Sequence, residues 1–98
     1  MLTGESLEKA MSRAVELEKN YDWMGSVELY RAALGMVPEQ DVVKAGVVHE
    51  RIGYGLFMAA MQADSVEEFK KRMRMSVEAY EKAAELFEKV EPVRGLYC

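Results

Sequence analysis

Apolar residues recur every three or four positions along most of the chain, which is the spacing of one face of an α-helix. The first run of this pattern predicts a helix over residues 6–20, with Ser6 as its N-cap. The second run follows Asp22, a residue type that favours a helix start, and predicts a helix that reaches about Val37. Because Pro38 disfavours helical geometry at the residue before it, the second helix is expected to end there.

Two longer helices are predicted in the second half of the chain. The third is expected to start between residues 38 and 41 and to continue to Ala63. Residues 65–68 read Ser-Val-Glu-Glu, a capping box in which the serine caps a helix and the second glutamate reaches back to the serine amide. The fourth helix is therefore expected to begin at Val66 and to end before Pro92.

These four helices and their short connections predict an all-α fold, with two antiparallel helical hairpins in a single domain over residues 1–98. The helices of the first hairpin are about 15 residues long and those of the second about 24, at a rise of about 1.5 Å per residue. The second hairpin is therefore expected to extend beyond the first.

The third helix carries apolar residues on two sides. One set is expected to face the core: Ala45, Val48, Ile52, Leu56, Ala59 and Ala63. A second set lies on another side: Val43, Val47, Tyr54, Phe57, Met58 and Met61. A helix that is apolar on two sides must be packed between neighbours or must bind something.

An internal repeat aligns residues 26–34 with residues 76–84. The pattern resembles the tetratricopeptide repeat, whose second helix carries a small residue, an aromatic residue, an alanine and then a proline. The residues at these places are Ser26, Tyr30, Ala33 and Pro38. The turn before that helix matches as Tyr21-Asp22-Trp23, the first helix as Ala14 and Leu17, and the first helix of the second unit as Ile52-Gly53 and Leu56. The resemblance covers most of the chain and implies an α-α superhelix.

The chain also departs from that pattern. Arg13 stands where the family has a leucine, and the second unit holds about eleven extra residues, nearly three helical turns, between Gly53 and Ser76. The opening hairpin is also similar to the microtubule-interacting and transport domain, although the long fourth helix does not suit that three-helix fold.

In the repeat family, the first helix of each hairpin lines an inner groove. The resemblance implies these groove residues: Met11, Val15, Glu18, Val47, Glu50, Tyr54 and Phe57. The implied function is a protein-interaction module, a scaffold or adaptor that binds a peptide or helix in an apolar groove with acidic edges. The lysines and asparagines with which chaperone-binding members clamp a terminal carboxylate have no counterparts at these places, so an amphipathic or basic segment is the expected partner.

A structural role is the alternative, in which the second hairpin joins two copies of the chain. Counted from the loop at Pro38, the second helix covers the third only to about Tyr54, and part of the apolar run beyond it is expected to be bare in a monomer. The expected homodimer contacts are Met58, Met61, Phe69 and Met73.

Composition excludes several other function classes. The chain is 50% apolar, has a formal net charge of −4 and contains one cysteine, so a disulfide framework is excluded and binding to nucleic acid or anionic lipid is disfavoured. The basic cluster at residues 70–74 is surrounded by glutamates and is expected to be a solvated helix face. No uncharged stretch approaches the roughly 18 residues that span a bilayer. We therefore expect a cytoplasmic module with protein partners, and neither nucleic acid nor membrane.

Candidate chemistry is sparse. His49-Glu50 begins like a zinc-protease helix, but Gly53 stands where the second histidine would lie, so His49 is expected to be packed or partly buried. No catalytic site, metal or cofactor is expected. Residues 93–98 look like the opening of a further helix, so the chain is expected to be part of a longer protein.

Overall fold

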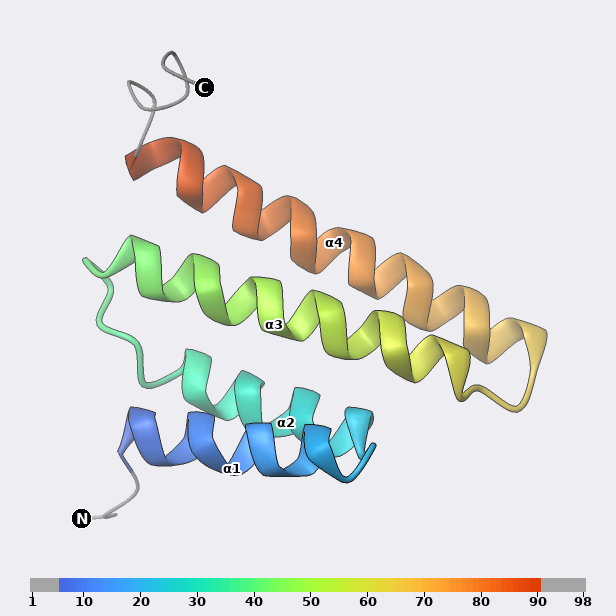
Figure 1. Cartoon of the computed structure of the whole chain (residues 1–98). Coiled ribbons are helices and arrows are strands. Elements are labelled where there is room, and N and C mark those ends of the chain that lie inside the picture. The colour runs from blue at the N-terminus through green and yellow to red at the C-terminus, as the bar shows by residue number, and fades with distance from the viewer. Residues whose placement is uncertain (1–5, 91–98) are drawn as a thin grey trace.

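The computed structural model describes residues 6–90, and the expectations for Pro92 and for residues 93–98 lie outside that range. The described residues form four α-helices and no strand: α1 (Leu7–Lys19), α2 (Trp23–Leu34), α3 (Val42–Met61) and α4 (Val66–Val90). Each helix packs against the next one along the chain in antiparallel order, with α1 in front of α2 and the longer α3 and α4 side by side above them (Figure 1). The predicted all-α fold of two hairpins, the second one longer, is confirmed.

Three of the helix starts are capped by the predicted side chains. Ser6 accepts a hydrogen bond from the amide of Lys9 at 3.1 Å, and Asp22 accepts one from the amide of Gly25 at 3.0 Å. Ser65 accepts one from the amide of Glu68 at 3.1 Å. The carboxylate of Glu68, which was expected to reach back to Ser65, forms an ion pair with Arg72 at 2.9 Å.

Helix α2 ends at Leu34, three residues before the predicted Val37. After Leu34 the amides of Met36 and Val37 bond to carbonyls three residues back, at 2.9 and 3.2 Å, so the chain leaves the helix through tighter turns. Gly35, a weak helix former, and the constraint that Pro38 places on the preceding residue account for this early end. Asp41 then caps α3 by accepting a bond from the amide of Lys44 at 3.1 Å.

The contacts of α3 with the first hairpin show how far α2 reaches along it. A Cβ added to Gly55 would lie 2.7 Å from a methyl group of Val27, and the amide of the Gln62 side chain donates to the carbonyl of Tyr21 at 2.9 Å. Because α2 begins at Trp23, whose ring meets that of Tyr54, these contacts agree with the prediction that α2 covers α3 to about Tyr54. The contact of Gln62 is made by the turn before α2. What projects beyond α1 and α2 is the end of the hairpin near the α3–α4 connection (Figure 1).

The core lies where α3 meets α1 and α2. Its buried cluster contains Ala14, Val27, Tyr30, Val48, Ile52 and Leu56. Of the six residues predicted on the core side of α3, Val48, Ile52, Leu56 and Ala59 are buried, while Ala45 and Ala63 are half-buried. The second apolar set of α3 stays half-buried or exposed, as the two-sided pattern predicted.

Helices α3 and α4 approach each other closely at two glycines seven residues apart. The ring of Phe87 lies over Gly46 and the ring of Tyr80 lies over Gly53, each within 3 Å of the point that a Cβ would occupy. Ser76 fixes the same register, because its hydroxyl donates to the carbonyl of Gly53 at 2.7 Å. Aromatic rings of α4 therefore rest directly on the backbone of α3.

Candidate functional site

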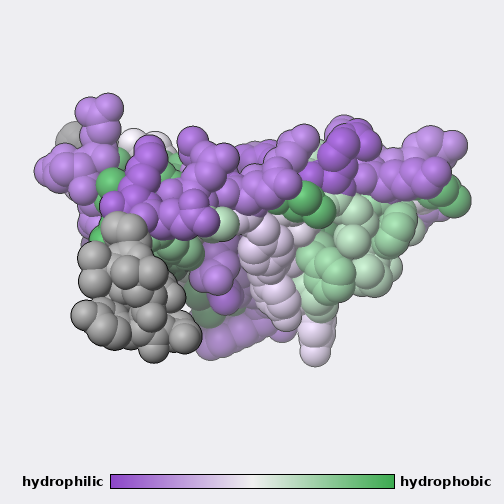
Figure 2. All heavy atoms as spheres, turned by 90° about the horizontal axis from the view of Figure 1, so that it is seen from above, coloured by the Kyte–Doolittle hydropathy of each residue, from purple (hydrophilic) through white to green (hydrophobic). Residues whose placement is uncertain are grey.

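One side of the α3–α4 hairpin is apolar and open, and we call it the open face. Its α3 residues follow the four-and-three spacing of a single helix side: Val43, Val47, Tyr54, Phe57 and Met61. Its α4 residues are Phe69, Met73, Val77 and Tyr80. Seen from above, the hydrophobic surface gathers toward the end of the hairpin with the α3–α4 connection, across from the hydrophilic band along α4 (Figure 2).

The exposed fractions of its side chains show that the open face is only partly covered. Tyr54 and Phe57 are 39% and 38% exposed, Met61 is 56% exposed, and Val77 and Tyr80 on α4 are 52% and 40% exposed. Single exposed apolar side chains are ordinary, but a continuous set on two adjacent helices is typical of an interaction surface.

Glu50 is the charged residue within the α3 part of this stripe, three positions after Val47 and four before Tyr54. Burial raises the pKa of Tyr80, and the negative charge of Glu50 raises it further. Glu50 lies one turn before Gly53, the residue on which the Tyr80 ring rests. The open face therefore carries an exposed carboxylate beside a half-covered tyrosine.

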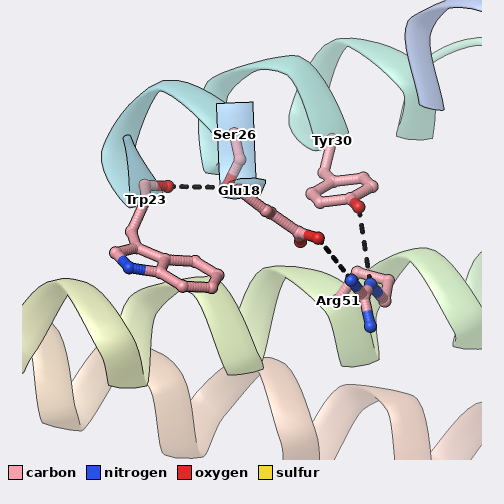
Figure 3. A network of polar contacts seen from close by, with 5 residues as sticks. All are labelled: Glu18, Trp23, Ser26, Tyr30 and Arg51. Atoms are coloured by element: carbon pink, nitrogen blue, oxygen red, sulfur yellow. Dashed lines mark hydrogen bonds and ion pairs between the residues drawn. The ribbon is translucent and has the colours of Figure 1, made fainter. Parts of the chain in front are cut away.

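Next to the open face, Arg51 joins the two hairpins (Figure 3). Its Nη2 donates to Oε1 of Glu18 from α1, and its Nε donates to the hydroxyl of Tyr30 from α2 at 3.4 Å. The guanidinium also lies 5.9 Å from the ring centre of Tyr30 and 5.8 Å from that of Tyr54. This one side chain thus contacts residues of α1, α2 and α3 through its charge, its hydrogen bonds and the aromatic rings beside it.

Glu18 is 9% exposed, and its Oε2 is buried without a hydrogen-bond partner in the described part of the chain. Burial raises the pKa of Tyr30, the Arg51 hydrogen bond opposes that rise, and the charge of Glu18 adds to it. The hydrogen bond to Tyr30 raises the pKa of Arg51 above its ordinary value. The arginine is therefore firmly charged where the buried carboxylate needs it.

Trp23 connects this network to the open face. Its ring meets the ring of Tyr54 edge to face, with centres 5.5 Å apart, and its carbonyl accepts a bond from the Ser26 hydroxyl at 2.8 Å. Tyr54 is therefore partly held by the first hairpin, although it is 39% exposed, about as much as Phe57 one turn later on α3.

The predicted groove residues fall into two groups. Val15, Glu50, Tyr54 and Phe57 are exposed, and Met11 and Val47 are half-buried, with Met11 packed against the core. Glu18 does not form an acidic edge as expected, because it is buried in its pair with Arg51. Sequence spacing missed Arg51 itself, because it directly follows His49 and Glu50 and no local pattern marks it as the partner of Glu18.

The residues predicted to join two copies also differ in exposure. Met61 and Phe69 are 56% and 38% exposed, while Met58 and Met73 are half-buried. All four belong to the part of the hairpin near the α3–α4 connection.

A separate cavity of about 380 Å³ lies between α2 and α4, over α3. Its apolar lining is Leu34, Ile52, Leu56, Met75 and Ala79, and its polar lining is Arg31, His49, Glu78 and Lys82. His49 is half-buried as predicted, and burial followed by the charge of Lys82 lowers its pKa. Within residues 6–90 there is no group of three or more side chains able to hold a metal ion, and no helix has the length and apolarity to cross a membrane.

Comparisons with protein-family models, with curated proteins and with solved structures give no match for this chain. Inferences about function therefore rest on the geometry of the open face and its neighbouring network.

Proposed function

We propose that the chain is a protein-interaction module, a tetratricopeptide-like pair of hairpins that binds an amphipathic helix on the open face. The observation that carries this proposal is the exposed apolar stripe of α3, in which Tyr54, Phe57 and Met61 are each more than a third exposed while the opposite side of the same helix is buried.

The shape of the stripe favours a helix as the partner. Val43 and Met61 are 18 positions apart, which is about 27 Å at a rise of about 1.5 Å per residue. Apolar residues of α4 run alongside, and rows of side chains on two adjacent helices are the kind of surface against which a third helix packs.

The repeat-like core supports the tetratricopeptide-like part of the proposal. Ser26, Tyr30 and Ala33, at the small, aromatic and alanine places of the pattern, are each 0% exposed. Ser76 and Ala83 of the second unit are each 3% exposed. These residues of the pattern therefore pack, whereas Tyr80, at the aromatic place of the second unit, is 40% exposed.

A binding experiment tests the function. A library of amphipathic helical peptides is selected against the full chain, and the selected peptide is then titrated against Phe57→Ala and against Tyr54→Ala with Phe57→Ala. We expect each variant to bind at least about tenfold more weakly while its helicity persists, because exposed aromatic residues are typical anchors. The matched control is Met36→Ala, whose side chain is 37% exposed but lies in the α2–α3 connection.

Three results contradict the proposal. No peptide is selected, or the Met36 variant weakens binding as much as the Phe57 variant, or loss of Phe57 unfolds the chain instead of weakening binding. The last result would make Phe57 a core residue.

Self-association is a second candidate function, favoured by the exposure of Met61 and Phe69 at the projecting end of the hairpin. Covering a few hundred Å² on each copy is worth several kcal/mol at about 25 cal/mol per Å², before the cost of association. Sedimentation of the chain at high concentration, alone and as Met61→Glu with Phe69→Glu, tests it. A dimer that the double variant makes monomeric supports this role, whereas a monomeric wild type, or a variant that remains dimeric, refutes it.

A further inference from the structure

The two hairpins repeat the same small, aromatic, alanine pattern, but their tyrosines end in different environments. Tyr30 and Tyr80 occupy equivalent places, since residues 26–34 align with residues 76–84. The flanking small residues are buried in both units, yet Tyr30 is 0% exposed and Tyr80 is 40% exposed. The difference arises because α3 lies over the first hairpin, whereas no helix of residues 6–90 lies over the second in the same way.

The first hairpin shows what completes such a site. The guanidinium of Arg51 of α3 lies 5.9 Å from the centre of the Tyr30 ring, within the range of a cation–π contact, and its Nε donates to the Tyr30 hydroxyl at 3.4 Å. The same guanidinium pairs with Glu18, a carboxylate supplied by the first helix of that hairpin. The site thus consists of a tyrosine and a glutamate from one hairpin, and an arginine from the helix that covers it.

The second hairpin presents the first two parts. Tyr80 rests on Gly53, and the exposed Glu50, again from the first helix of the hairpin, lies three positions before Gly53, about one turn along the same side of α3. The position of the acid differs, because Glu50 precedes Gly53 by three residues whereas Glu18 follows the corresponding Ala14 by four. Both arrangements nevertheless place a negative charge beside a tyrosine on the surface that the next helix would cover.

We propose that the helix that docks on the open face supplies an arginine that contacts the ring and hydroxyl of Tyr80 and pairs with Glu50, as Arg51 does with Tyr30 and Glu18. This inference rests on the proposed function and names the chemistry of its partner: an amphipathic helix with a central arginine. Arginine fits better than lysine, because its planar guanidinium stacks on a ring and still directs donors to a carboxylate.

A synthetic helix tests the inference. The probe presents the α3 residues that face the first hairpin, Val48, Arg51, Ile52, Leu56 and Ala59, with alanine, glutamate and lysine on its remaining sides. A second probe carries glutamine in place of the arginine. Both are titrated by fluorescence anisotropy against the full chain, against Glu50→Gln, and against the control Glu67→Gln, which removes an exposed carboxylate from the first turn of α4.

The arginine probe should bind wild type and Glu67→Gln about tenfold more tightly than the glutamine probe, since a charge-assisted hydrogen bond is worth about that much. With Glu50→Gln the two probes should bind equally. That loss of discrimination, with wild-type helicity retained, is a readout that general damage to the fold would not give.

The outcomes separate the two proposals. If both probes bind wild type equally, and Phe57→Ala weakens both, the arginine site is refuted while helix docking stands. If discrimination survives in Glu50→Gln, the arginine contacts another carboxylate and the assignment is wrong. If neither probe binds, or if Phe57→Ala leaves the affinity of both probes unchanged, helix docking on the open face is refuted and the arginine site is refuted with it.

Discussion

Replacing Arg51 with methionine should destabilise the chain much more than replacing Glu18 with glutamine, although both changes break the same ion pair. The two partners sit in different environments, since the Glu18 side chain is 9% exposed and that of Arg51 is 39% exposed. Removing the arginine leaves a buried carboxylate without its cation. Removing the charge of Glu18 leaves an arginine that water can still reach.

The magnitudes follow from this asymmetry. Removing one partner of a fully buried ion pair costs about 3–5 kcal/mol. The Glu18–Arg51 pair is only partly buried, so we expect Arg51→Met to cost about 2–3 kcal/mol. This figure includes the lost contacts of the guanidinium with the rings of Tyr30 and Tyr54. Glutamine at position 18 keeps the shape and one oxygen acceptor for Arg51, so Glu18→Gln should cost about 1 kcal/mol or less.

Urea unfolding followed by far-UV circular dichroism gives both free energies, and Arg31→Met provides the matched control. The Arg31 side chain is 41% exposed, almost the same as Arg51, but its partner Glu28 is 66% exposed at 3.5 Å. An exposed pair of this kind is worth about 0–1 kcal/mol, so this variant should stay close to wild type. Equal losses for Arg51→Met and Glu18→Gln, or a loss for Arg31→Met as large as that for Arg51→Met, would refute the reasoning.

Two further predictions concern packing and pH. Gly55→Ala should destabilise the chain by about 1–3 kcal/mol in urea unfolding, because the new Cβ would lie 2.7 Å from a methyl group of the fully buried Val27. The control Gly35→Ala should be neutral or stabilising, because the nearest atom to its new Cβ is 3.4 Å away. Burial and then the charge of Lys82 lower the pKa of His49 below 6.5, so the unfolded chain takes up a proton at this residue before the folded chain does. The stability of the fold should therefore decline as the pH falls from 6.5 toward the lowered pKa. His49→Gln should lack that part of the decline when unfolding midpoints are compared across this range.

Much of the fold could be predicted because its signals are local. Ser6, Asp22 and Ser65 cap helices through bonds that span three residues, and such bonds leave a pattern that can be recognised in a short window. The end of α2 was less predictable. The restriction imposed by Pro38 sets the last position that a helix can reach, but it does not require the helix to continue that far past Gly35.

The site was only partly predictable, for a related reason. The apolar positions of the open face follow from helical spacing, so Tyr54, Phe57 and Met61 were found from the sequence. The pairing of Glu18 with Arg51 spans 33 positions and depends on the register in which the first hairpin packs against α3. Glu18 was assigned to an open edge from its place in the repeat pattern, and that pattern carries no information on the arginine that α3 brings beside it.

The three glycines of α3 explain how this helix packs closely against both α2 and α4. Each costs a helix about 1 kcal/mol relative to alanine, yet Gly55 admits Val27 of α2, while Gly46 and Gly53 admit the rings of Phe87 and Tyr80 of α4. Close packing on these two sides offsets that cost and holds α3 rigidly between its neighbours. The remaining side of α3 could have been charged, as the outer face of α4 is, without disturbing either contact. Apolar side chains stand there instead, with Glu50 as the charged residue among them. They stand on a helix that is packed on two sides, and such a surface can bind a partner with little loss of its own conformational entropy.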